Sequence, residues 1–95
     1  MSGALALPAA PASLTHADAA AYVARCEQAI ASGGAGAHCE LDASALEDFD
    51  SAALAALLAV RRRALAVKGT LRVHGLPERL QSLATLYGVS DLLPA

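Results

Sequence analysis

Three short apolar stretches, each followed by a helical pattern, constrain the fold of this chain more than any other feature. The strand candidates are ALAL at 4–7, AHCELDA at 37–43 and TLRVHG at 70–75. Helical periodicity follows them at about 16–32, 51–67 and 77–87, with glycines near the helix ends. Strands that alternate with helices favour a mainly parallel sheet joined by right-handed crossovers. The sequence therefore predicts a single α/β domain over residues 1–95.

Local signals define the ends of these elements. Thr15 is the expected N-cap of the first helix, with Asp18 in the capping-box position, and Gly33 and Gly34 are expected to end that helix. An inward stripe is predicted for the last helix, consisting of Leu80, Leu83, Ala84 and Tyr87. The tail VSDLLPA, residues 89–95, is interpreted as a short final edge strand.

Charge and hydropathy argue against nucleic-acid and membrane-spanning classes. The formal net charge of -2 provides no field that would recruit nucleic acid or an anionic membrane. The basic run Arg61, Arg62, Arg63 spreads around its helix, so it forms no single phosphate-binding patch. The apolar run at 52–60 is too short to span a bilayer, and the first residues lack the pattern of a secretory signal. We expect a cytoplasmic protein.

The cysteines, histidines and glycines lack the spacing of a metal or cofactor site. Cys26 and Cys39 have no CxxC spacing and are predicted to be reduced, buried thiols. The three histidines, His16, His38 and His74, are far apart in the sequence. The glycine-rich segment 31–38 follows a helix and precedes a strand, which is the wrong order for a phosphate-binding loop. We therefore expect no metal and no cofactor.

An acidic cluster precedes the helix at 51–67, but the sequence shows no nucleophile paired with a base beside it. Its members are Glu47, Asp48 and Asp50. Carboxylates at a helix N-terminus accept hydrogen bonds from free N–H groups and favour the helix dipole, which is the simpler interpretation. Ser51 would act as a nucleophile only with a base in reach, and no G-x-S-x-G elbow surrounds it. The sequence thus predicts a protein that is not an enzyme.

The helix at 51–67 has two apolar faces. Its charge-free half carries Ala53, Ala56, Leu57, Val60, Ala64 and Val67. A second row consists of Leu54, Leu58 and Leu65, close to Arg61. The helical wheel leaves two alternatives: this second row is buried with the arginine head in water, or it forms an exposed interaction stripe with a polar rim.

The start of the same helix is predicted to be a compact docking surface. Ser51 precedes two small residues, Ala52 and Ala53, which allow another backbone to approach closely. The helix start also lies past the carboxyl end of a strand, where open α/β sheets place their sites. A phosphate on Ser51 would sit on the N-terminus of the helix.

Short motifs follow one another in an order that resembles the STAS domain. Leu41-Asp42 ends a strand, Asp50-Ser51-Ala52-Ala53-Leu54 opens a helix, and Gly69 precedes the strand Leu71-Arg72-Val73. The resemblance covers about 38–95 and implies a small sheet with helices packed on one side. Family members usually begin with a hairpin. Because Pro8 and Pro11 interrupt that region, about 1–14, we expect a shortened or irregular hairpin here.

Two branches of the family differ at the helix start. The anti-anti-sigma branch reads D-S-S-G-L and is phosphorylated on its second serine, whereas this chain has Ala52 there and Ala53 in place of the glycine. The MlaB branch has one hydroxyl residue followed by two small residues. This chain has the same pattern, in which Ala52 and Ala53 follow Ser51. The ending of the MlaB branch also resembles this one, at Leu83, Ala84, Leu86, Tyr87, Val89, Asp91, Leu92, Leu93 and Pro94.

The resemblance implies a non-catalytic accessory subunit. Its partner would be the ATPase subunit of an ABC-type phospholipid-trafficking (Mla) system, which maintains outer-membrane lipid asymmetry, and through it an inner-membrane permease. The implied partner-binding residues are Asp50, Ser51, Ala52, Ala53, Leu54, Leu58, Arg61 and Arg62. The alternative is an anti-anti-sigma factor, for which Ser51 is the candidate phosphorylation site. The isolated chain is expected to be able to form a homodimer, since an exposed apolar face pairs with itself when its partner is missing.

Overall fold

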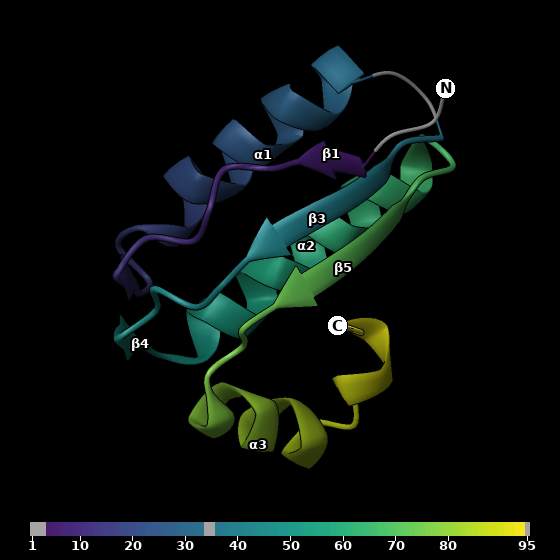
Figure 1. Ribbon diagram of the computed structural model, residues 1–95. Helices are drawn as coiled ribbons and strands as arrows, with labels where there is room; N and C mark the ends of the chain where they lie inside the picture. Colours follow the sequence, from purple (N-terminus) through teal and green to yellow (C-terminus); the bar gives the residue numbers. More distant parts are fainter. Residues whose placement is uncertain (1–3, 34–35, 95) are drawn as a thin grey trace.

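The computed structural model describes residues 4–33 and 36–94, in which strands and helices alternate (Figure 1). The strands are β1 (Ala4–Ala6), β2 (Ser13–Leu14), β3 (His38–Asp42), β4 (Asp48–Phe49) and β5 (Thr70–His74). The helices are α1 (Ala19–Gly33), α2 (Ser51–Ala66) and α3 (Glu78–Leu86), followed by the 3₁₀ helix η1 (Ser90–Leu92). The predicted α/β class is confirmed.

The main sheet is parallel, as the alternation predicts. Its order is β1-β3-β5, and the register places Cys39 of the central strand between Leu5 and Leu71. β2 and β4 form a separate two-stranded parallel sheet. Because parallel neighbours cannot be joined by a tight turn, α1 and α2 lie in the crossovers that lead into β3 and β5.

The segment before α1 holds two strands that pair with other strands and not with each other. β1 pairs with β3 and β2 with β4, so residues 4–14 form no hairpin ladder. The N–H groups of Leu7 and Ala10 donate to the carbonyls of Glu40 (2.9 Å) and Asp42 (2.8 Å). Pro8 has no N–H group, so the chain continues beside β3 with an interrupted ladder. Residues 1–3 of the expected hairpin region lie outside the described residues.

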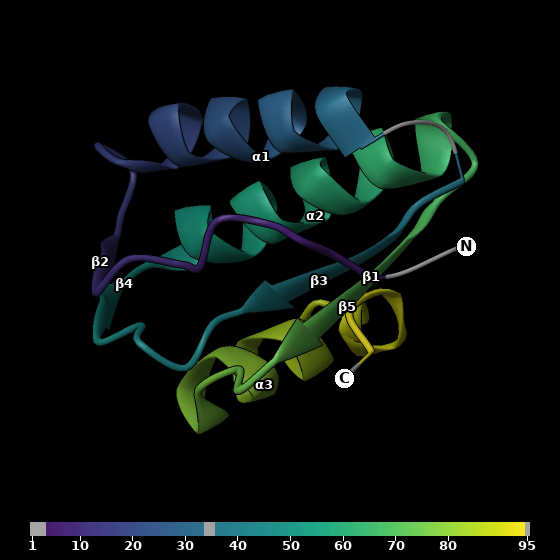
Figure 2. The same cartoon turned by 45° about the horizontal axis from the view of Figure 1, so that its top comes forward.

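The helices lie on one side of the main sheet. α1 and α2 run side by side in one layer, with α1 over the side of the sheet formed by β1 and α2 over β3 and β5, while α3 lies past the edge formed by β5 (Figures 1 and 2). The open face of the sheet carries polar side chains, and two pairs cross it. His38 Nδ1 lies 2.9 Å from the hydroxyl of Thr70, and His74 Nε2 lies 2.7 Å from the carboxylate of Glu40.

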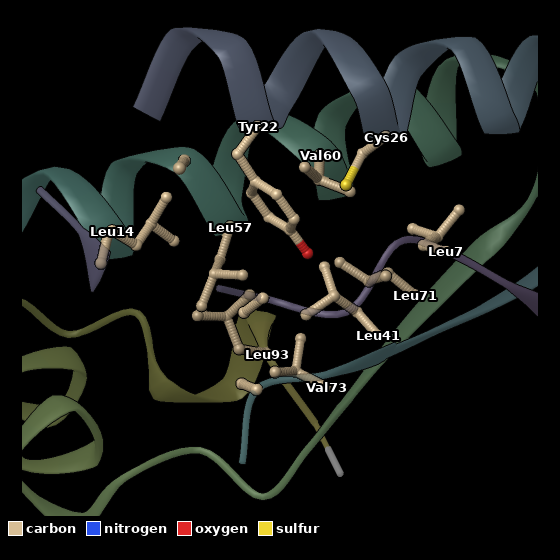
Figure 3. Packing of buried hydrophobic residues seen from close by; sticks show 14 of the residues in the cluster. Leu7, Leu14, Tyr22, Cys26, Leu41, Leu57, Val60, Leu71, Val73 and Leu93 are labelled. Carbon is tan, nitrogen blue, oxygen red and sulfur yellow. The ribbon is translucent and has the colours of Figure 1, made fainter. Parts of the chain in front are cut away.

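The core fills the space between the helices and the covered face of the sheet. Figure 3 shows Tyr22 and Cys26 of α1 packed with Leu57 of α2 above the sheet. The Tyr22 hydroxyl donates to the Pro8 carbonyl (2.7 Å), so this buried oxygen has a partner, and burial raises its pKa. Cys26 and Cys39 are buried free thiols, as predicted, and burial raises the pKa of both.

The start of α1 carries one half of the predicted capping box, because the Asp18 N–H group donates to the Thr15 carbonyl and not to the Thr15 hydroxyl. The Asp18 carboxylate accepts hydrogen bonds from the N–H group (3.2 Å) and the hydroxyl (3.1 Å) of Thr15, and from the hydroxyl of Ser13 (3.0 Å). The backbone bond to Thr15 contributes most to holding the pKa of Asp18 below its ordinary value. Gly33 is the last residue of α1, and Gly34, also expected at this end, lies outside the described residues.

Two sequence-based predictions about the C-terminal part are wrong. Tyr87, expected to face inward, is 58% exposed, because α3 ends at Leu86 and Gly88 (φ 72°) then redirects the chain. Leu80 and Ala84 of the same predicted stripe are buried. Over its described residues, 89–94, the tail forms η1 and no strand. One sheet-like bond remains, in which the N–H group of Val73 donates to the Pro94 carbonyl (2.9 Å).

Replacing the fully buried Leu57 by alanine should lower the free energy of unfolding by about 2–5 kcal/mol, since the loss of apolar contact is combined with a cavity. The matched control is Leu86→Ala at a leucine that is 77% exposed, for which a change within about 0.5 kcal/mol is expected. Urea unfolding followed by circular dichroism measures both. Equal effects of the two substitutions would contradict the packing described above.

Asp18→Ala should lower the unfolding temperature at neutral pH, and its difference from the unchanged chain should shrink in acid. The folded-state pKa of Asp18 is depressed, so its stabilisation is present above the unfolded-state pKa and is lost as pH falls through the folded value, below about pH 4. Thermal unfolding across a pH series measures this, with Glu27→Ala on the exposed side of α1 as control. A difference that stays constant with pH would count against the capping role.

Candidate partner-binding surface

Asp50 joins the starts of the two longest helices. It is the N-cap of α2, and its carboxylate accepts from the N–H group of Ala52 (2.8 Å) and from the N–H group of His16 (3.2 Å). A capping carboxylate satisfies N–H groups that have no partner within the helix. These two bonds fix the start of α2 against the turn that precedes α1, and Ser51 follows as an exposed first residue of α2.

A shallow groove of about 250 Å³ separates the start of α2 from α3. It is lined by Phe49, Asp50, Ser51, Arg79, Ser82 and Leu83. The guanidinium of Arg79 lies 5.0 Å from the centre of the Phe49 ring, within cation–π range, so this arginine is held at the groove. Ser51 therefore lies in a groove that also contains a cation, a second serine and an apolar wall.

Sequence reasoning did not place α3 at this site. Arg79, Ser82 and Leu83 follow the i, i+3, i+4 spacing of one helix face, which is a detectable signal. What that face packs against depends on the path of the chain after β5, and no local pattern specifies it. Phe49 was likewise not singled out.

The predicted partner-binding residues divide into accessible and inaccessible sets. Asp50, Ser51 and Arg62 are exposed, and Ala52, Leu58 and Arg61 are half-buried. Ala53 and Leu54 are buried, which places their side chains in the core and not on an accessible surface. Leu54 is buried in a helix that packs against α3 as well as against the sheet and α1. The charge-free half of α2 is buried over five of its predicted positions: Ala53, Ala56, Leu57, Val60 and Ala64.

One row of α2 passes from the core to the solvent. We call it the α2 stripe, and it consists of Ser51, Leu54, Leu58, Arg61 and Leu65. Beyond its exposed first residue, its exposure increases along the helix: Leu54 is buried, Leu58 is half-buried and Leu65 is 44% exposed. The two alternatives left by the helical wheel are therefore both realised, burial at Leu54 and exposure farther along the helix.

The groove offers little for catalysis. Its lining includes one carboxylate, that of Asp50, and both oxygens of this group already accept backbone N–H donors. No group of three or more histidine, cysteine, aspartate or glutamate residues that could hold a metal ion is found in residues 4–33 and 36–94. The arrangement presents hydroxyls, a guanidinium and apolar side chains, which is chemistry suited to recognition.

One protein-family model matches most of the chain. A family model described as "Mlab, STAS domain" matches residues 10–94. The chain belongs to the STAS family. It resembles the MlaB members most closely among the branches considered above, and STAS domains are generally non-catalytic. No curated protein and no solved structure gave a match. Over the described ranges no helix has the length and apolar character needed to cross a bilayer.

Asp50→Ala should lower the free energy of unfolding by about 0.5–2 kcal/mol, since it removes the cap of α2 and the bond to His16. Asp48→Ala, two residues earlier at an exposed position, is the control and should change stability by less than about 0.5 kcal/mol. Urea denaturation tests both variants. If both behave like the unchanged chain, Asp50 does not hold the start of α2 in place.

Proposed function

We propose that this STAS-domain chain is a non-catalytic accessory subunit that binds the ATPase subunit of an ABC-type phospholipid-trafficking (Mla) system. The observation that carries the proposal is the exposed Ser51 at the start of α2, in a groove, in a domain matched by an MlaB-type family model. The chain would support assembly or activity of the ATPase. It would lie in the cytoplasm and reach an inner-membrane permease only through that partner.

Exposure along α2 supports a docking role for this helix. Core packing accounts for the buried half of α2, yet Leu58 and Leu65 leave apolar surface uncovered beside Arg61 and Arg62. An apolar strip bordered by charge is a common form of protein interface. Ser51 at one end adds a small polar group where a partner backbone can approach closely, because Ala52 and Ala55 beside it are small.

The alternative function, an anti-anti-sigma factor, gains no specific support from the structure. The position of the phosphorylated serine in that branch is occupied by Ala52, which is half-buried and donates its N–H group to Asp50. Ser51 is the hydroxyl residue at the helix start, and it lies in the groove.

Ser51→Arg and Leu58→Arg should each weaken binding to the purified ATPase subunit of the same organism by roughly 30-fold or more, about 2 kcal/mol, since a long charged side chain within an interface prevents close packing. Isothermal titration measures the affinity, and circular dichroism checks that each variant is folded. Ala24→Arg, at an exposed position on α1, is the matched control and should bind normally.

Normal binding by both folded variants would show that the interface lies elsewhere on the chain. Failure of the unchanged chain to bind the ATPase would refute the proposed function itself.

A further inference from the structure

The α2 stripe has the spacing of a helix–helix contact line. Its residues follow at intervals of three, four, three and four positions, which is the a/d pattern of a heptad. Such a row stays on one side of a helix and packs knobs into holes on a second helix. α3 covers the row near Leu54, but from Leu58 onward no described element buries it fully. The uncovered part thus has the geometry that accepts another helix.

The charge beside this stripe is positive, opposite in sign to that of the whole chain. Arg61 lies within the stripe, Arg62 beside it, and Arg79 in the groove at its start. Among the described residues, none of these three guanidinium groups forms an ion pair with a carboxylate. Asp50 is the carboxylate in the groove, and its oxygens accept two backbone N–H groups. Glu27 of α1 borders a separate hollow with Arg62 and Arg63, without an ion pair.

We infer that the partner contributes an acidic amphipathic α-helix, which lies along the α2 stripe with its apolar side on Leu58 and Leu83. This inference rests on the proposed function only for the identity of the protein that carries the helix. Carboxylates on the incoming helix would meet Arg79 at one end of the contact and Arg61 and Arg62 at the other. From Ser51 to Arg62 the axial rise of α2 is about 16 Å, so the carboxylates would stand about three helical turns apart.

A second copy of this chain fits the stripe poorly. In a parallel arrangement Arg61 would face Arg61 of the second copy. In an antiparallel arrangement Arg62 of the second copy would approach the groove that holds Arg79. Like charges placed together at an interface repel each other, so the stripe disfavours a second copy of this chain and favours an acidic helix.

The first experiment uses two synthetic helical peptides with the same leucine pattern, one with glutamate and the other with lysine at the flanking positions. Nuclear magnetic resonance titration of the isotope-labelled chain should show the glutamate peptide shifting the amide signals of Ser51, Leu58 and Ser82. It should bind at least about tenfold more tightly than the lysine peptide. Equal affinities, no binding of the glutamate peptide, or shifts confined to other surfaces would overturn the inference.

The second experiment uses the purified ATPase and the double variant Arg62→Gln/Arg79→Gln. Its dissociation constant should rise at least about tenfold and become less sensitive to salt. Arg63→Gln is the matched control, since Arg63 borders the same hollow as Arg62 but points about 100° away around α2. Normal binding by the double variant, together with loss of binding by Ser51→Arg, would refute the acidic helix and leave the proposed function standing.

Sedimentation of the chain without a partner tests the remaining alternative, in which a second copy of this chain occupies the α2 stripe. A monomer is expected at all concentrations, in place of the homodimer that the sequence suggested, because the arginines of two copies would meet. A dimer that Leu58→Arg abolishes would show that a second copy occupies the stripe, and it would overturn the choice of partner. If the unchanged chain does not bind the ATPase, the proposed function fails, and the peptide titration still decides whether the stripe accepts an acidic helix.

Discussion

The packing of α2 against three neighbours is the constraint on which the rest of the structure depends. The sheet through β5, α1 and α3 each contact this helix, so the residues that face these three neighbours must be apolar or small. Leu57 and Val60 are fully buried in consequence. A helix in that position cannot show the broad polar face of an ordinary surface helix. Its solvent-facing side carries mostly small and apolar residues together with Ser51 and the arginines, so a partner would contact these residues.

The hydrogen bonds of Asp50 fix the position of the groove residues at the start of α2. One carboxylate binds the start of α2 and the turn before α1, so the position of Ser51 is coupled to two parts of the core. Arg79, held on the ring of Phe49, comes from α3 on the opposite side of the groove. The groove therefore combines side chains from distant parts of the sequence on rigid elements. That arrangement suits a recognition surface, because little side-chain ordering remains to be done on binding.

Patterns set by near neighbours in the chain were predictable, and contacts between distant elements were not. The alternation of strands and helices, the Asp18 cap and the buried thiols follow from spacing and composition. The burial of Leu54 depends on α3 packing against α2, and the pairing of β2 with β4 depends on where two short segments meet. Tyr87 does not face inward as the helical period predicts, because α3 ends one residue before it, at Leu86. A helical wheel gives directions around an axis, but it does not specify what lies in each direction.

Whole-chain charge is a poor guide to the sign of charge at the site. The sequence has nine acidic and seven basic residues, and its net charge of -2 argues against non-specific attraction to polyanions. Binding at contact distance depends on the few charges within about one Debye length of the interface, roughly 8 Å at physiological ionic strength. Beside the α2 stripe these charges are mainly arginines, while the Asp50 carboxylate is already engaged with backbone donors. An acidic partner helix is thus compatible with an acidic protein, because the distribution of charge over the surface decides which partner fits.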